Sequence, residues 1–163
     1  MSDFLATLNL SGTGFCASFN FRRTARAVTR LYDQAFQKFG IRSTQFSIMI
    51  AVAKTQPVSI SRLGEILVTD RTTLTRSLSL MQKQQLLLVS SRSIKRQRFV
   101  NLTAEGEKVL AQVLPEWRKV QELFVKAVGP DYWRHLQGEL ESLSSMASKL
   151  APKEPPPPDS DTP

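Results

Sequence analysis

Residues 70–106 read DRTTLTRSLSLMQKQQLLLVSSRSIKRQRFVNLTAEG, and most of this stretch lacks acidic side chains. Residues 71–104 form an interval of 34 residues without Asp or Glu. Its first part has apolar residues at helical spacing, which predicts a helix over residues 71–84. The interval carries seven basic residues, which are Arg71, Arg76, Lys83, Arg92, Lys95, Arg96 and Arg98. The first three fall on the predicted helix, and the other four lie beyond it.

Two short β-prone runs follow this helix, at residues 86–90 and 99–102. The polar and basic residues 91–98 separate them, which predicts a β-hairpin with a basic tip. A helix followed by a basic hairpin can present one set of side chains to a DNA major groove and another to the backbone or minor groove. Nucleic-acid binding is therefore the leading hypothesis.

Helical patterns also precede this region. Apolar residues at helical spacing predict a helix over about residues 15–39, which Gly40 should end. A second helix is expected from Ser43 or Thr44 to about Lys54, and a short one should carry Leu63, Ile66 and Leu67. Val58 and Ile60 could contribute one short strand between them.

Further helices are expected after the hairpin. Thr103 is a suitable cap for a helix with acidic residues in its first turn, and Pro115 is expected to kink that helix or to begin a new segment. The pattern continues to Gly129. From Asp131 to Leu150 a narrow apolar seam predicts a long helix that packs against another helix, such as one from a second subunit.

Composition bounds the class of protein. The net charge of +8 divides into +11 over residues 1–104 and −3 over residues 105–163, so polyanion binding should be confined to one part. No apolar run is long enough to span a bilayer, and residues 1–15 do not read as a signal peptide. With a single cysteine and no signal, we expect a cytoplasmic protein that does not associate with membranes.

The motifs together resemble the MarR family of bacterial transcription regulators. The matching stretches are IRSTQF at residues 41–46, SRLGEIL at 61–67, DRTTLTR at 70–76, the strand at 95–100 and LTAEG at 102–106. The resemblance implies a mainly α fold with a small β-hairpin wing. In it, a winged helix-turn-helix domain is joined to N- and C-terminal helices that form a dimerisation layer. It also implies a homodimer bound to a pseudo-palindromic operator in double-stranded DNA.

The resemblance assigns roles by position. The recognition helix should contact DNA through Arg71, Thr72, Thr73, Thr75 and Arg76, and the wing through Arg92, Lys95, Arg96 and Arg98. Thr hydroxyls can bond bases or phosphates, and Arg can pair with guanine edges. Two positions depart from the family pattern. Ile94 stands where the family usually has Asp, and Gln84-Gln85 stands where it usually has Gly. The geometry of the wing could therefore differ from the family's, and Arg92 or Arg98 could share the role of Arg96, which matches the family's wing arginine.

The regulator is expected to be a repressor that a small molecule releases from DNA. A hydrophobic pocket could be lined by Tyr32, Phe36, Phe39, Phe46 and Trp117, although aromatic residues at helical spacing are mostly core. The resemblance implies that a small aromatic or phenolic effector binds there. Cys16 is a candidate redox sensor, and the alternative is a small buried residue at the dimer interface. A rival of a different class is a protein-interaction module without DNA binding.

No catalytic pair, metal-ligand cluster or cofactor motif stands out, so we expect neither an enzyme nor a metal or cofactor site. The predicted organisation has four parts. They are a flexible N-terminal arm (1–14), a helical dimerisation region (15–40 and 105–150), a winged helix-turn-helix domain (41–104) and a disordered Pro-rich tail (151–163). The operator, the regulated genes and the effector cannot be identified from the sequence.

Overall fold

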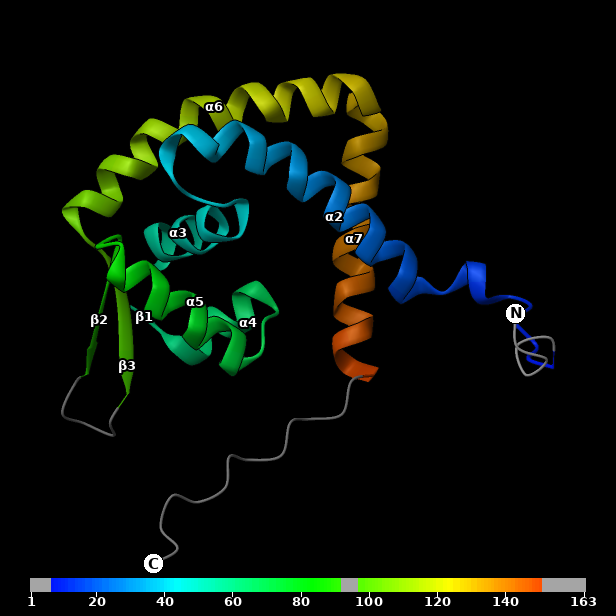
Figure 1. The fold of residues 1–163 in the computed structure, drawn as a ribbon, viewed down its shortest axis with the longest axis horizontal. Coiled ribbons are helices and arrows are strands. Elements are labelled where there is room, and N and C mark those ends of the chain that lie inside the picture. The colour runs from blue at the N-terminus through cyan, green and yellow to red at the C-terminus, as the bar shows by residue number, and fades with distance from the viewer. Residues whose placement is uncertain (1–6, 92–96, 151–163) are drawn as a thin grey trace, which may run out of the picture. The chain divides into compact units, whose positions relative to one another are not determined.

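The computed structural model describes residues 7–91 and 97–150. It is mainly helical with one small antiparallel sheet, so the predicted fold class of a winged helix-turn-helix with flanking helices is confirmed (Figure 1). The elements are η1 Thr13–Phe15, α2 Ala17–Phe36, η2 Gln37–Phe39, α3 Ser43–Thr55, β1 Val58–Ser59, α4 Ile60–Leu67, α5 Arg71–Lys83, β2 Leu87–Ser91, β3 Arg98–Leu102, α6 Ala104–Val128 and α7 Pro130–Leu150. Two compact units divide between Val120 and Gln121.

The first unit is built around α3. This helix contacts α2 on one side and α4 on the other, as Figure 1 shows. The buried apolar side chains come from every α-helix and strand between α2 and the first half of α6, and the largest fully buried ones are Phe36, Met49, Val52, Leu63, Leu74, Leu78, Met81, Val100 and Val113. One core therefore joins the helix-turn-helix, the sheet and parts of both flanking helices. The predicted boundaries of the DNA-binding and dimerisation regions stay a prediction.

The sheet has the strand order β1-β3-β2 and is antiparallel throughout. Val100 at its centre pairs with Val58 on one side and with Val89 on the other. Residues directly opposite each other share a face, so these three valines turn to the same side, and Val100 is fully buried. The sheet thereby attaches the hairpin to the core of the unit.

One expectation about an element boundary was wrong, and one of the two alternatives expected at Pro115 is excluded. Ile60 belongs to α4 and not to a strand, because the Ser59 hydroxyl accepts the N–H of Arg62 at 3.2 Å and starts the helix there. No new segment begins at Pro115, since α6 continues through it as one helix. Proline removes one backbone hydrogen bond, but Val113 and Trp117 on either side of it pack on the core and hold the helix in place.

The N-terminal half of α2 is covered much less than its C-terminal half. Phe19 is 58% exposed and Phe21 48% exposed, whereas Phe36 is fully buried. The helix ends as predicted: after η2, Gly40 adopts a left-handed conformation with φ 69°. The amphipathic pattern of α2 therefore continues beyond the surface that this chain itself covers.

The second unit contains the end of α6 and α7. Phe124 and Trp133 meet edge to face with ring centroids 5.2 Å apart, on either side of Gly129 with its φ of 98°. The apolar seam predicted for the last helix lies largely exposed in the single chain, with Leu143 at 41% and Leu150 at 86%. In the part of the chain that the structure describes, no helix is both long and apolar enough to cross a membrane.

Candidate nucleic-acid interface

The helix-turn-helix consists of α4, α5 and the turn between them. Val68 ends α4 in the left-handed region, with φ 49° and ψ 49°. Asp70 then caps α5, because its carboxylate accepts the backbone N–H of Thr73 at 2.8 Å. This hydrogen bond holds the pKa of Asp70 below its usual range, so the carboxylate caps the helix at neutral pH.

One face of α5 is buried and the other is free. Leu74, Leu78 and Met81 are at most 2% exposed and fix the helix on the core. The predicted DNA-contact residues Arg71, Thr72, Thr73 and Arg76 are all exposed, and Thr75 is half-buried. Arg71 and Arg76 form no ion pair within residues 7–91 and 97–150. The exposed side of the first two turns therefore offers two guanidinium groups and two hydroxyl groups to an outside partner.

The wing is described only in part. Its strands β2 and β3 pair in register from Leu87 with Leu102 to Ser91 with Arg98, and the Arg98 side chain is exposed. The candidate contact residues Arg92, Lys95 and Arg96, together with Ile94, lie outside the described residues. The predicted hairpin is thus confirmed in its strands, and the roles of its tip residues remain predictions.

The C-terminal end of α5 is tied to the start of α6. Gln85 adopts a left-handed conformation with φ 58°, at the place where the resembling family usually has Gly. Its carbonyl oxygen accepts the Thr103 hydroxyl, and that hydroxyl oxygen accepts the N–H of Gly106 at 3.0 Å. A Cβ at Gly106 would overlap the carbonyl oxygen of Leu86. The Leu-Thr-x-x-Gly motif therefore has a structural role: it allows α6 to begin directly against the chain that leaves α5.

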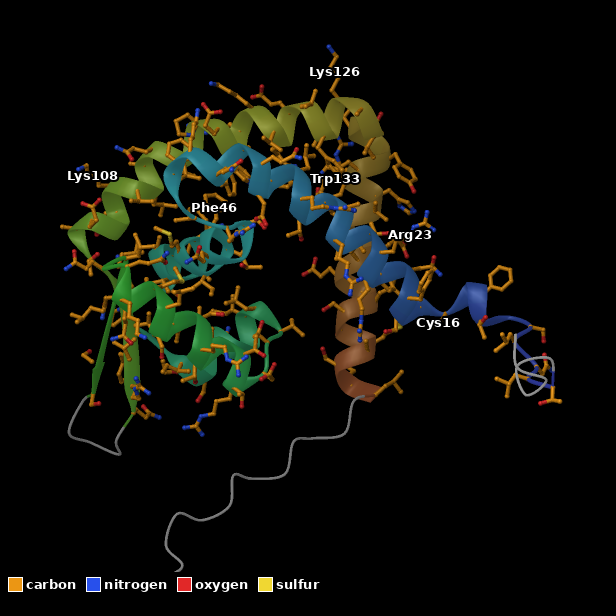
Figure 2. The ribbon with its side chains drawn as sticks, viewed as in Figure 1. Cys16, Arg23, Phe46, Lys108, Lys126 and Trp133 are labelled. Atoms are coloured by element: carbon orange, nitrogen blue, oxygen red, sulfur yellow. The ribbon has the colours of Figure 1, made fainter. Side chains whose placement is uncertain are left out.

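A cavity of about 760 Å³ lies between α2, α3, α4 and the first half of α6. Four of the predicted pocket residues line it, and they are Tyr32, Phe36, Phe46 and Trp117. Their rings form a continuous row, with centroids 6.1 Å, 5.0 Å and 6.1 Å apart. Figure 2 shows Phe46 on α3. Burial raises the pKa of the Tyr32 hydroxyl, so that group is a neutral hydrogen-bonding group at physiological pH.

Phe39 does not line this cavity. Its ring instead lies under the Lys38 ammonium group, with the nitrogen 5.1 Å from the ring centroid. Phe39 was predicted to line the pocket because it continues the spacing of the other aromatic residues, but η2 changes the helical phase after Phe36. The polar rim of Ser43, Thr44 and Lys54 was not predicted, because a single sequence has no periodic signal for it.

Cys16 is exposed immediately before α2 (Figure 2). In the single chain it is not the small buried residue that one alternative expected, although a partner subunit could still cover it. A role in redox sensing stays a prediction. Among the residues that the structure describes, no group of three or more His, Cys, Asp or Glu side chains could hold a metal ion.

Known proteins resemble the chain in both sequence and fold. A crystal structure of the Mycobacterium tuberculosis transcriptional regulator MosR in complex with DNA is 31% identical, covers 84% of this chain and 99% of its own, and superimposes with a TM-score of 0.78. A MarR family transcriptional regulator from Streptomyces coelicolor, AbsC, is 19% identical and has the same fold, with a TM-score of 0.71 over 88% of this chain and 99% of its own. No protein-family model matches the sequence.

Among curated proteins, the transcriptional regulator HosA of Escherichia coli O127:H6 is 38% identical over 82 residues. The alignment covers 50% of this chain and 61% of HosA. The chain thus spans less than two thirds of the length of the curated relatives it matches, while it spans nearly all of the MosR chain.

Proposed function

Because the chain belongs to the MarR family of winged helix-turn-helix transcription regulators, which are not enzymes, we propose that it binds double-stranded DNA sequence-specifically and regulates transcription. The observation that carries this proposal is the exposed face of α5. Arg71, Thr72, Thr73 and Arg76 are exposed there, while the opposite face is fixed in the core. The relative MosR, with which the chain shares 31% identity, has been crystallised with DNA.

In the proposed complex, the first two turns of α5 enter the major groove. The N-terminus of a helix attracts a phosphate, and the Thr72 and Thr73 hydroxyls can bond phosphates or base edges. Arg76 lies one turn further along the helix, where its guanidinium group can form two hydrogen bonds with a guanine. The wing would follow the neighbouring backbone or minor groove with Arg98 and with the tip residues Arg92, Lys95 and Arg96.

We further propose that the active form is a homodimer on a pseudo-palindromic operator. Apolar side chains are exposed along the N-terminal half of α2 and along α7, and a second copy could bury them. Dimers of helix-turn-helix proteins read half-sites about 34 Å apart, so the two α5 helices would have to be held at that spacing. This arrangement suits a repressor acting in the bacterial cytoplasm.

The cavity beside α3 supports a proposal for how an effector releases the protein from DNA. Its aromatic row and the rim of Ser43, Thr44 and Lys54 suit a small aromatic or phenolic molecule with a polar or anionic group. The same cavity is walled by Ile66 and Leu67 at the end of α4, directly before the turn that leads into α5. An effector that spreads these walls would move the recognition helix and weaken operator binding.

The proposal is tested with Arg76→Ala. We expect its dissociation constant for the operator, measured by fluorescence anisotropy, to rise about 10- to 100-fold, because a bidentate arginine contact with guanine contributes about 1–3 kcal/mol. Arg118→Ala is the matched control, since Arg118 is also exposed but lies on α6. Equal affinities for the wild type and Arg76→Ala would contradict the assigned recognition helix. Failure of the wild type to bind any duplex would favour a protein-interaction module.

A further inference from the structure

Gln45 on α3 is the one buried polar side chain in the part of the chain that the structure describes, with an exposure of 7%. Its Oε1 accepts the backbone N–H of Arg42 at 2.9 Å, and its Nε2 donates to Oε1 of Gln84 at 2.6 Å. A backbone N–H can only donate, so the contact with Arg42 fixes which way the Gln45 amide points. Its NH₂ group must therefore face Gln84, and Gln84 must accept.

Gln84 is the C-cap residue of α5. It stands directly before the left-handed Gln85, whose carbonyl oxygen accepts the Thr103 hydroxyl at the start of α6. The end of the candidate recognition helix is thus held from two sides. Its backbone is attached to α6, and its last side chain is attached to α3.

The first turn of α3 is itself anchored to α2. The carboxylate of Asp33 accepts the N–H of Ser43 at 2.7 Å and lies 3.4 Å from Nη1 of Arg42. Burial alone would raise the pKa of Asp33, but the hydrogen bonds from Ser43 and Arg42 outweigh it and hold the pKa below its usual range. Asp33 is therefore charged at neutral pH, and it joins α2 to the turn of α3 that carries Gln45.

The same turn of α3 forms part of the cavity wall. Ser43, Thr44 and Phe46 line the cavity, and Gln45 between them turns instead toward α5. A shift of this turn caused by a molecule in the cavity would consequently reach the end of α5 through a single hydrogen bond. No backbone connection shorter than 39 residues joins these two places.

We propose that Gln45 and Gln84 are positioning residues that set the orientation of α5 for base recognition. The inference rests on the proposed DNA-binding function. Leu74, Leu78 and Met81 hold α5 by apolar contacts that set which face turns outward but tolerate small rotations, whereas a hydrogen bond between two side chains has a preferred direction and restricts those small rotations about the helix axis. Base contacts need that geometry, while contacts with phosphates tolerate small rotations.

The test measures specificity rather than affinity alone. A duplex is first selected by the wild-type protein from a pool of random sequences. Dissociation constants are then measured at one salt concentration for this duplex and for an unrelated duplex of equal length. In Gln84→Met, which keeps the side-chain length but removes the acceptor, we expect the ratio of the two constants to fall about 3- to 10-fold, the effect of one hydrogen bond on an equilibrium.

Four further variants separate positioning from folding. Gln82→Met changes another glutamine of α5, whose side chain makes no hydrogen bond within residues 7–91 and 97–150, and should keep the wild-type ratio. Gln84→Glu keeps an acceptor for Gln45 and should keep the ratio even if its added charge weakens binding to both duplexes. Gln45→Met combined with Gln84→Met should have the same ratio as Gln45→Met alone, because the two substitutions remove the same hydrogen bond between Gln45 and Gln84.

An unchanged ratio in Gln84→Met would overturn the inference and leave the proposed function intact. Equal weakening of binding to both duplexes leaves the ratio unchanged, so it counts against the inference as well and indicates loss of folded protein. If the wild type selects no duplex from the pool, the proposed function fails, and the positioning role fails with it. A lowered ratio in Gln84→Met but not in Gln82→Met or Gln84→Glu supports the inference.

Discussion

The first turns of α5 and its last turn differ in how their side chains are used. At the start, Arg71, Thr72 and Thr73 are exposed, and the helix end is held by the Asp70 cap and by the buried Leu74. At the end, Met81 is fully buried, and Gln84 and Gln85 are bonded to neighbouring elements. A helix that reads DNA needs free side chains at the end that enters the groove and a fixed opposite end. The comparison indicates that α5 meets both needs.

The largest effect on this difference is expected when the contacts at the C-terminal end of α5 are disrupted. In Gly106→Ala the new Cβ would overlap the Leu86 carbonyl oxygen and come within 3.3 Å of Leu102 Cδ2. We expect the free energy of unfolding, measured in urea, to fall by about 2–3 kcal/mol, because backbone cannot move aside as a flexible side chain can. Gly138→Ala is the control, since no atom of residues 7–91 and 97–150 lies within 4 Å of its Cβ position and alanine favours helix. Similar unfolding of the two variants would argue against a tight contact at Gly106.

A smaller effect is expected at the free end. Asp70→Ala removes the cap of α5 and should lower stability at neutral pH by less than Gly106→Ala does. Asp70→Asn keeps a capping oxygen and should stay close to the wild type.

The cap also predicts a pH dependence. The pKa of Asp70 is lowered in the folded state, so its stabilising contribution is present above the pKa of the unfolded chain. That contribution is lost as the pH falls through the depressed pKa. The stability difference between the wild type and Asp70→Ala, followed by thermal unfolding, should therefore shrink in acid, and a constant difference would contradict a charged cap.

The smallest effect, and one of opposite sign, is expected in the turn before the free end. Val68 is a β-branched residue in the left-handed region and is 67% exposed, so it loses few contacts when it is shortened. Val68→Gly should raise the free energy of unfolding by up to about 1 kcal/mol, because glycine adopts this conformation without steric cost. Val68→Ala, which keeps a Cβ, should gain clearly less. No gain in either variant would show that the turn carries no strain.

The sequence predicted the bounds of most helices and strands more accurately than it predicted which residues contact one another. Helical periodicity predicted α3 and α5 nearly to the residue, and Gly40 and Thr103 marked where helices end and begin. The prediction failed at Ile60, where the cap at Ser59 outweighed β propensity. At Pro115 the local pattern left two alternatives open, and core packing on both sides keeps one helix continuous. Boundaries of this kind depend on competing contacts that a local pattern does not contain.

The residues of the candidate site were also predicted in part from the sequence. The set of basic and hydroxyl residues on one face of α5 follows from spacing alone, because the buried leucines fix which face turns outward. Four of the five predicted cavity residues also came together, while Phe39 did not, because η2 alters the helical phase. No pattern in the sequence pointed to Gln45, since one glutamine in an apolar helix has no periodic partner.

By itself, then, the sequence determined the order of the helices, the hairpin, and the segregation of positive charge onto the part of the chain with the helix-turn-helix. These depend on local spacing and on the chemistry of side chains near one another in the chain. Only the tertiary structure decided that Gln45 meets Gln84 across 39 residues, that Gly106 must lack a side chain, and which four aromatic rings line one cavity. The physical reason is that such contacts depend on the path of the backbone through space, which the packing of the whole core determines.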